Sequence, residues 1–316
     1  GGSHGKTTIT SMILHVLNEL SIQCDYLVGA QLKGFETMVK LTDENPIIIL
    51  EGDEYLSSAI DRKPKFHLYH PHIAVISGIA WDHINVFPTF KKYVDQFRIF
   101  KNLVKETLIY FEEDIELKKL MKEKTKCKKI AYNTPKYKII NGETYIENNK
   151  LSIFGKHNLQ NINAAKIVCK ELGVEEHEFY NKITTFKGAS NRLELIYNNK
   201  TCAIYKDFAH SPSKLKATIN AMKKQFPNRK LIACMELHTY SSLNINFLKE
   251  YHGSMEDADI PIIYYNIESI KHKGLDYIQK KDVFNAFDNK KLIIHTNALN
   301  LKKFLNNIEW EKSNLL

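Results

Sequence analysis

The sequence contains, in its first eight residues, GGSHGKTT, a glycine-rich stretch with one lysine and two threonines. Gly2 and Gly5 allow the backbone to approach a ligand closely and to adopt positive φ angles. Lys6 adds an ammonium group, and Thr7 offers a hydroxyl group to a metal ion. Apolar residues then recur at helical spacing over 9–20. The stretch therefore predicts a loop that presents backbone N–H groups at a helix N-terminus, an arrangement that binds phosphate.

The complete phosphate-loop pattern requires a further glycine before Gly1, and a strand normally leads into such a loop. We therefore expect the sequence to be a fragment of a longer chain. The alternative is a glycine-rich helix cap in which Lys6 is incidental.

Two further polar segments follow apolar runs that read as strands. EGDEY follows the run at 46–50, and WDHINVF follows the run at 73–79. In an open α/β sheet, ligands bind at the carboxyl ends of the strands. Glu51 could hold Mg²⁺ through oxygen, and His83 could ligate a metal or orient a phosphate. The alternatives are a solvated acidic turn and a structural loop histidine.

Polar residues also stand at three sites later in the sequence. Asn158 and Asn161 are three apart on one helix face and could contact the edge of a purine, although Asn158 could equally cap the helix. Arg192 lies in KGASNRLE. Asp207 and His210 lie between a predicted strand and a helix that begins with proline, where plain turn and cap chemistry is the alternative.

Short β-branched runs alternate with helical patterns, which predicts an α/β fold with a mainly parallel sheet. A chain of 316 residues is long for one domain, and we place the boundary between 1–186 and 187–316. In the first part, the expected strands are 46–50, 73–79, 107–111 and 128–132, the helices are 90–103 and 158–172, and hairpins occupy 136–155. In the second part, we expect a hairpin at 193–207, strands at 230–236, 260–265 and 291–296, and helices after Pro212, near 244–251, at about 275–286 and near the end.

The composition limits the classes of function. The net charge of +9 comes almost wholly from lysine, and the arginines that favour nucleic-acid recognition number only four, so we expect no nucleic-acid partner. No apolar run approaches the roughly 18 residues of a membrane span, so we expect no membrane partner. The five cysteines are scattered and form no CxxC pair, which indicates a reducing, cytoplasmic location. The oligomeric state is left open.

Taken in order, GSHGKTT, EGDEY, WDHINVF, KHNLQN, NRLE and KDFAHSP resemble the motifs of the Mur ligases, the ATP-dependent amide-forming enzymes of cell-wall precursor synthesis. That family has a uridine-nucleotide domain, a central ATPase domain and a Rossmann-like C-terminal domain. The resemblance implies that 1–186 is the central P-loop-type domain and 187–316 is the C-terminal domain. It also implies that the first domain, the strand before the loop and the final strands are missing.

The resemblance implies that the protein uses ATP and Mg²⁺. The catalytic residues that it implies are Lys6, Glu51, His83 and Arg192, and the metal ligands are Thr7, Glu51 and His83. The nucleotide-binding residues that it implies are Gly2, Ser3, His4, Gly5, Lys6, Thr7, Thr8, Asn158, Asn161, Arg192, Asp207 and His210. Two departures are visible: no carbamylated lysine can be placed in the helix after WDHINVF, and KDFAHSP has Lys206 and Ser211 where Asp and His are common.

The acceptor specificity has more than one interpretation. GSHGKTT resembles the branch that joins L-alanine to UDP-N-acetylmuramate, whereas EGDEY and the segment after it look more like murein peptide ligase. We therefore expect a ligase that joins L-alanyl-γ-D-glutamyl-meso-diaminopimelate to UDP-N-acetylmuramate in peptidoglycan recycling. The alternatives are the alanine ligase of de novo synthesis, a folate-polyglutamate-type ligase and a non-catalytic nucleotide-binding protein.

Overall fold

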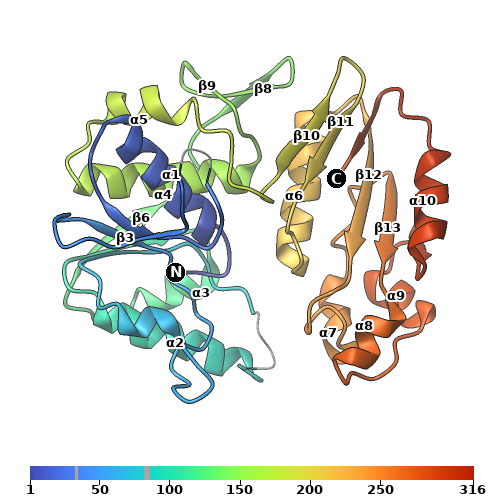
Figure 1. Ribbon diagram of the computed structural model, residues 1–316, viewed down its shortest axis with the longest axis horizontal. Coiled ribbons are helices and arrows are strands. Elements are labelled where there is room, and N and C mark those ends of the chain that lie inside the picture. The colour runs from blue at the N-terminus through green and yellow to red at the C-terminus, as the bar shows by residue number, and fades with distance from the viewer. Residues whose placement is uncertain (33–34, 82–85) are drawn as a thin grey trace. The chain divides into compact units, whose positions relative to one another are not determined.

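A computed structural model describes residues 1–32, 35–81 and 86–316. The chain divides into two compact units, Gly1–Ser190 and Asn191–Leu316, so the division falls a few residues after the expected boundary (Figure 1). Both units combine helices with parallel strand pairs, which confirms the predicted α/β fold class, and each unit also contains antiparallel pairs.

In the described part of the first unit, the parallel pairs lie in two separate three-stranded sheets rather than in the single sheet that we expected, and β2 joins the first of these sheets antiparallel to β1. One has the order β2-β1-β3 and the other the order β4-β5-β6. The strands are β1 (Asp25–Leu27), β2 (Val39–Lys40), β3 (Ile48–Leu50), β4 (Ile73–Ile76), β5 (Thr107–Phe111) and β6 (Lys128–Tyr132). The apolar run at 46–50 and the runs at 73–79, 107–111 and 128–132 do contain strands, but β1 and β2 were not predicted.

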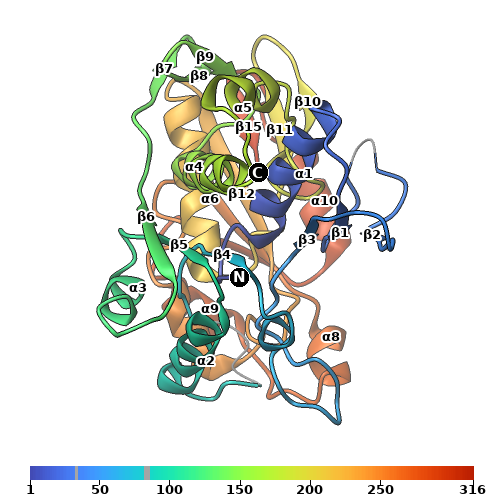
Figure 2. The ribbon, with the colours of Figure 1, turned by 90° about the vertical axis from the view of Figure 1, so that its left-hand side faces the viewer.

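Helices cover both faces of these strands (Figures 1 and 2). On one face lie α1 (Lys6–Glu19), α4 (Lys156–Glu171) and α5 (Glu176–Ile183), and on the other lie α2 (Phe90–Leu103) and α3 (Ile115–Leu120). The 3-10 turn η1 is Lys65–Leu68 and precedes β4. Amphipathic spacing buries Met12, Leu17 and Leu159 on the first face and Phe97 on the second.

Residues 138–151 form an antiparallel meander, as the Asn-Gly and Asn-Asn turns predicted. Its strands are β7 (Lys138–Ile140), β8 (Glu143–Ile146) and β9 (Asn149–Leu151).

Glu113 joins three segments of the first unit. Its carboxylate accepts hydrogen bonds from the Thr134 backbone N–H at 2.9 Å and hydroxyl at 2.7 Å, and from Lys156 Nζ at 2.9 Å. The backbone bond from Thr134 is the largest cause that lowers the pKa of Glu113 to about 2. The contacts connect the ends of β5 and β6 to the start of α4.

Glu113→Gln is therefore expected to lower the free energy of unfolding at pH 7 by about 1 kcal/mol, a value reduced for solvent screening because Glu113 is exposed. The native pKa lies below the ordinary value of 4.5, so this stabilisation is present above pH 4.5 and is lost as the pH falls toward 2. Urea unfolding between pH 2 and 7 measures it. Glu112→Gln is the matched control, and an equal pH dependence for both variants would contradict the assignment to Glu113.

The second unit contains, among its described residues, a six-stranded sheet with the order β10-β11-β15-β12-β13-β14. Only β10 and β11 pair antiparallel, which matches the predicted hairpin. The strands are β10 (Glu194–Asn198), β11 (Ala203–Lys206), β12 (Lys230–Glu236), β13 (Ile260–Tyr264), β14 (Ile293–His295) and β15 (Ser313–Leu315). The short β15 lies inside the sheet, between β11 and β12.

The helices of this unit are α6 (Pro212–Gln225), α7 (Ile245–Leu248) with the 3-10 turn η2 (Lys249–Tyr251), α8 (Ile267–His272), α9 (Lys280–Phe287) and α10 (Ala298–Asn306). The prediction missed α8, and it began the next helix at about 275, several residues before α9. Asn266 caps α8 by accepting from the Glu268 N–H at 2.8 Å, a local signal that marked this start.

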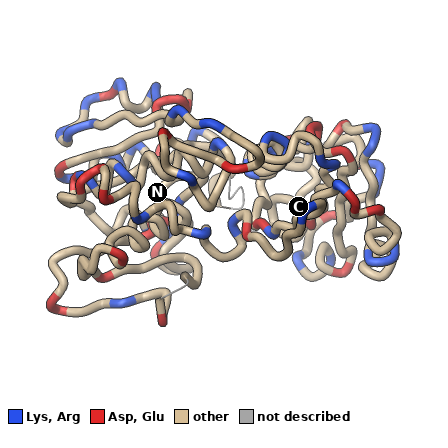
Figure 3. The backbone as a smooth tube through the Cα atoms, turned by 90° about the horizontal axis from the view of Figure 1, so that it is seen from above, with Lys and Arg blue, Asp and Glu red and all other residues tan. Residues whose placement is uncertain are grey.

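Lysine and arginine are interspersed with acidic residues along the described chain (Figure 3). No helix among the described residues is long and apolar enough to cross a membrane.

Candidate functional site

The glycine-rich loop lies against the end of β4 and the start of α1. Gly2 has a φ of +125°, and a Cβ there would meet the Ser77 backbone nitrogen at 2.8 Å. Gly5 has a φ of +73°, and a Cβ there would overlap the carboxamide of Asn161. The Ser3 N–H donates to the Gly78 carbonyl at 3.0 Å. Side chains at both glycine positions are therefore excluded by conformation and by space.

The loop leads into α1, and the backbone N–H groups at the start of this helix can bind an anion. Gly5 is the N-cap of α1, and Ile9 N–H donates to its carbonyl at 2.7 Å. The N–H groups of Lys6, Thr7 and Thr8 belong to the first turn, which has no earlier helical carbonyl to bind. Their alignment and the helix dipole together favour a phosphate at this position.

Glu51 contacts the loop directly after β3, where the sequence placed it. Its Oε1 accepts a hydrogen bond from the Thr7 hydroxyl at 2.8 Å, and its Oε2 accepts one from the Gly29 N–H at 2.7 Å. Thr7 and Glu51 are far apart in sequence, so their contact supplies two adjacent oxygen groups of the kind that Mg²⁺ prefers. His83, the third expected ligand, lies outside the described residues.

Lys6 forms an ion pair that the sequence analysis missed. Its Nζ lies 2.5 Å from Glu54 Oε2, and the Glu54 side chain is only 1% exposed. Tyr93 donates to the other Glu54 oxygen at 3.1 Å, and the Tyr93 hydroxyl lies 2.9 Å from Ser3 Oγ. Glu54 is the second glutamate of EGDEY, and its spacing of three from Glu51 was the available signal.

This environment keeps Lys6 charged. Burial disfavours the ammonium form, but the charge and hydrogen bond of Glu54, with the charges of Asp53 and Glu51, outweigh it and raise the pKa of Lys6. Lys6 is therefore an ammonium group at neutral pH, held at the first residue of α1 beside the backbone donors.

The segment that follows β4 is held by Ser77 and Asp114, neither of which was predicted. Ser77 Oγ donates to the His4 carbonyl, which fixes the loop to the strand end. Asp114 accepts from the Ile79 N–H at 2.9 Å and caps α3 by accepting from the Leu117 N–H at 2.8 Å. These contacts position the backbone directly before the segment that carries His83.

The two asparagines of α4 are both buried. The helix begins at Lys156, two residues before the predicted start, with Gly155 as N-cap, so the alternative that Asn158 caps the helix is wrong. Asn158 instead donates to the Phe154 carbonyl at 2.9 Å. Asn161 lies against Gly5 of the loop. Contact of either residue with adenine stays a prediction.

The second unit places Arg192, Asp207 and His210 around one loop. The Arg192 guanidinium lies 5.3 Å from the ring centre of Phe208, and the His210 ring lies 4.7 Å from it. Asp207 accepts from the Phe208 N–H and from the Thr218 hydroxyl, both at 2.7 Å. The loop is therefore bonded to α6 through Asp207, and its aromatic ring carries a cation on one side.

No group of three His, Cys, Asp or Glu side chains that could hold a metal ion occurs within residues 1–32, 35–81 and 86–316. Thr7 and Glu51 nevertheless fit Mg²⁺, because they combine a hydroxyl and a carboxylate beside a phosphate-type loop.

Comparisons with known proteins identify relatives of this chain. The family profile described as the Mur ligase middle domain matches residues 1–169. A UDP-N-acetylmuramate–L-alanine ligase of Phocaeicola vulgatus is 25% identical over 299 residues, covering 90% of this chain and 63% of that protein. Seven further curated relatives, 24–29% identical, carry the same name. The chain thus spans about three fifths of the length of the first relatives that it matches.

Among the solved structures that share this fold are two ligases. The MurF ligase of Thermotoga maritima in complex with ADP matches with a TM-score of 0.72 and 18% sequence identity. The match covers 99% of this chain and 74% of the MurF chain. The murein peptide ligase of Psychrobacter arcticus matches with a TM-score of 0.66 and 19% sequence identity. The match covers 99% of this chain and 72% of the murein peptide ligase chain.

Proposed function

This chain belongs to the Mur ligase family, and from that premise we propose that it is the nucleotide-binding and C-terminal part of an ATP-dependent ligase that acts on UDP-N-acetylmuramate in peptidoglycan synthesis. The observation that supports this most is the convergence of Lys6, Thr7 and Glu51 at the start of α1. A protein that only bound a nucleotide would need the loop and Lys6, but it would not need a carboxylate held against Thr7.

In the proposed reaction, a carboxylate oxygen of UDP-N-acetylmuramate attacks the γ-phosphorus of ATP. A carboxyl–phosphate bond forms and the bond to ADP breaks. The amine of the acceptor then attacks the acyl carbon, the C–N bond forms, phosphate leaves, and the amine loses a proton. Charge accumulates on oxygen throughout, so oriented donors and cations lower the barrier more than covalent help from the protein would.

The described residues suit these demands. The first-turn N–H groups of α1 and the Lys6 ammonium would bind the β- and γ-phosphates of ATP. Thr7 and Glu51 would hold Mg²⁺, which when bound would neutralise charge on the phosphate oxygens. In the absence of ATP, the buried Glu54 keeps Lys6 charged and holds its ammonium group in place.

We propose L-alanine as the acceptor, in place of the tripeptide that EGDEY favoured. The curated relatives named here are all UDP-N-acetylmuramate–L-alanine ligases. The tripeptide is the second candidate, and the murein peptide ligase of Psychrobacter arcticus supports it through the fold alone.

The natural protein that carries this chain tests the proposal. We expect ADP release with ATP, Mg²⁺, UDP-N-acetylmuramate and L-alanine, and little release when either acceptor or muramate substrate is omitted. A higher kcat/KM with the tripeptide would reverse the choice of acceptor. ADP release with a folate and glutamate, or ATP binding without turnover on any of these substrates, would contradict the ligase proposal.

Arg192→Lys is expected to lower kcat roughly tenfold and to change the KM for ATP much less, because an ammonium keeps the charge but loses the planar fork of donors. We propose that this fork contacts the phosphoryl group during transfer. Steady-state kinetics measure both constants. Arg229→Lys is a matched control, since Arg229 also lies over a phenylalanine, at 4.9 Å from the Phe226 ring centre. Unchanged kcat in Arg192→Lys would make Arg192 a structural residue.

A further inference from the structure

Three buried polar side chains connect the Lys6 ammonium group to the backbone that follows β4. Lys6 pairs with one Glu54 oxygen, and the Tyr93 hydroxyl donates to the other at 3.1 Å. The same hydroxyl lies 2.9 Å from Ser3 Oγ, which in turn accepts from the Ala80 N–H at 2.8 Å. The exposed fractions of Glu54, Tyr93 and Ser3 are 1%, 0% and 3%. Hydrogen bonds in so dry an interior are stronger than in water and make the side chains that they join rigid.

The chemistry of these groups determines the direction of each hydrogen bond. A tyrosine hydroxyl has one proton, and Tyr93 donates it to the Glu54 carboxylate. In the contact between Ser3 and Tyr93, the proton therefore comes from Ser3. The Ser3 oxygen keeps its lone pairs, and one of them accepts from the Ala80 N–H. All the protons thus point toward Glu54, and rotation of one hydroxyl would break the bond of its neighbour.

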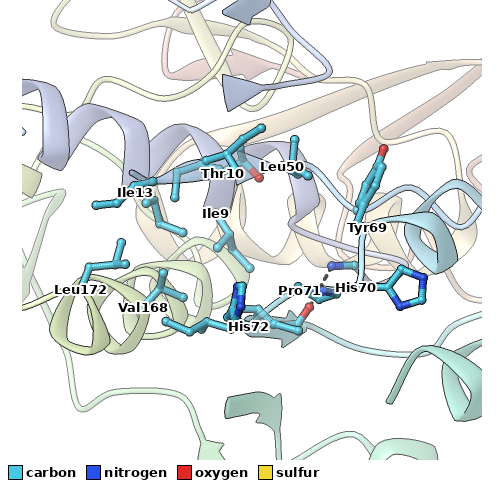
Figure 4. Close-up of a pocket in the computed structure, with 18 of the residues that line it drawn as sticks. Ile9, Thr10, Ile13, Leu50, Tyr69, His70, Pro71, His72, Val168 and Leu172 are labelled. Atoms are coloured by element: carbon cyan, nitrogen blue, oxygen red, sulfur yellow. Dashed lines mark hydrogen bonds between the residues drawn. The ribbon is translucent and has the colours of Figure 1, made fainter. Parts of the chain in front are cut away.

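Apolar packing fixes the helix that carries Lys6, but not the end of the Lys6 side chain. α1 and α4 belong to one hydrophobic core. Side chains of both helices line one mainly apolar pocket, among them Ile9, Ile13, Val168 and Leu172 (Figure 4). Apolar contacts are not directional, so they hold a helix in place without orienting an ammonium group. The position of the Lys6 ammonium group therefore depends on its ion pair with Glu54.

The Tyr93 ring is held independently of its hydroxyl. Its centre lies 5.4 Å from that of Phe87 and 5.2 Å from that of Phe97. The Tyr93 N–H donates to the carbonyl of Thr89, the N-cap of α2, at 3.2 Å. A fixed ring thus presents its hydroxyl between Glu54 and Ser3. Phenylalanine at this position would keep the ring contacts and lose only the hydroxyl.

We propose that Tyr93 is a positioning residue for the lysine of the phosphate site. Its hydroxyl orients Glu54, and Glu54 holds the Lys6 ammonium group beside the first-turn N–H groups of α1. Through Ser3, the same hydroxyl ties this arrangement to the backbone at Ala80. Tyr93 acts through these residues rather than on a substrate. The inference rests on the proposed function in one respect, which is that Lys6 binds phosphate.

Tyr93→Phe tests the proposal. We expect the Kd of this chain for ATP with Mg²⁺ to rise roughly tenfold, an effect of the size that loss of one charged hydrogen bond has, because Glu54 no longer holds Lys6 in one position. Calorimetric titration measures the Kd, and thermal unfolding checks that the variant is folded. Tyr145→Phe is the matched control, because Tyr145 donates at 2.8 Å to Glu143, which also pairs with a lysine, Lys150. The control should leave the Kd unchanged.

A background without the ion pair distinguishes positioning of Lys6 from a general effect on the fold. In the double variant Lys6→Met with Glu54→Gln, Tyr93 has no lysine to position. Adding Tyr93→Phe to this variant should therefore change its remaining ATP affinity less than about twofold. A tyrosine with a merely structural role would lower the affinity by the same factor in both backgrounds.

A measurement without nucleotide tests the link to Ala80. In Tyr93→Phe, Ser3 loses the acceptor that fixes its hydroxyl, so amide hydrogen exchange at Ala80 should become roughly tenfold faster. Exchange at Leu108 should stay unchanged, because this residue lies in β5, which pairs with strands on both sides.

An unchanged Kd for ATP in Tyr93→Phe would overturn the proposal, and so would an equal loss of affinity in the two backgrounds. Exchange at Ala80 that equals the wild-type rate would overturn the link through Ser3. If the wild-type chain itself bound no ATP, the proposed function would fail instead. The exchange measurement would still show whether Tyr93 fixes Ser3 and Ala80, so the two failures are separate results.

Discussion

Replacing Lys6 with methionine is expected to weaken ATP binding and turnover on the order of 100-fold. The substitution removes an ammonium group that donates charged hydrogen bonds to phosphate, each worth about 1.5–3 kcal/mol. Tenfold in affinity corresponds to about 1.4 kcal/mol, so one or two such bonds account for the expected loss. Calorimetric titration with ATP and Mg²⁺ measures binding in this chain, and ADP release measures turnover in the natural protein that carries it.

The same substitution also affects stability, because Lys6 neutralises Glu54. With the lysine removed, a carboxylate that is 1% exposed loses its ion pair with Lys6, and breaking a buried pair typically costs about 3–5 kcal/mol. Lys6→Met alone could therefore lose ATP binding by losing its fold. Glu54→Gln in the same chain removes the carboxylate charge and keeps a group that can accept from Tyr93.

The double variant Lys6→Met with Glu54→Gln separates the two roles. We expect it to recover most of the unfolding free energy and none of the ATP affinity. Lys91→Ala removes an exposed lysine from the first turn of α2 and is the control for net charge. ATP affinity within threefold of wild type in a folded double variant would exclude Lys6 from the phosphate site.

Glu51→Gln is expected to raise the Mg²⁺ concentration needed for half-maximal ATP binding by at least about 10-fold. Loss of a residue that only supports a metal ligand already weakens metal affinity roughly 10- to 100-fold, and Glu51 is proposed as a ligand itself. Glutamine keeps one oxygen, which can accept from either the Thr7 hydroxyl or the Gly29 N–H, and it places an NH₂ group opposite the other. We expect a stability loss of only about 1 kcal/mol from that one bond. The effect on metal dependence should therefore exceed the effect on folding.

Asp53→Asn is the matched control for Glu51→Gln. Asp53 lies two residues later in the same segment and pairs with Lys65 at 3.3 Å. Both substitutions remove one negative charge from EGDEY, but the structure bonds only Glu51 to the loop threonine. Titration of ATP binding with Mg²⁺ compares them. An equal shift in both variants would indicate a general field effect and would contradict a specific metal role for Glu51.

The local sequence was sufficient for much of the fold. The expected helix at 90–103 and the strands at 107–111 and 128–132 agree with α2, β5 and β6 at both ends, because their apolar periodicity is strong and their ends carry turn or capping residues. The glycine-rich loop also followed from sequence, since glycine, lysine and threonine at that spacing restrict the backbone and its donors locally.

The local sequence did not predict the two shortest strands of the first unit. β1 and β2 contain three and two residues, too few for a periodic signal, and they are strands because neighbouring strands pair with them. For β15, only the structure shows its position inside the second sheet, where β11 and β12 bond to it on both sides. The structure divides the described strands of the first unit into three separate sheets, and no local pattern encodes which strand edges meet.

The candidate site likewise contains residues that the sequence predicted and one that only the structure identified. The sequence placed Lys6, Thr7 and Glu51 together, because strand ends and a helix start must meet at one edge of a parallel sheet. It did not distinguish Glu54 from the other carboxylates of EGDEY. Only the tertiary structure buries Glu54 beneath Tyr93 and against Lys6, where low solvent exposure makes its charge decisive for the lysine. Residue types determine which groups can do chemistry, whereas burial determines which of them interact strongly, and burial is a property of the folded chain.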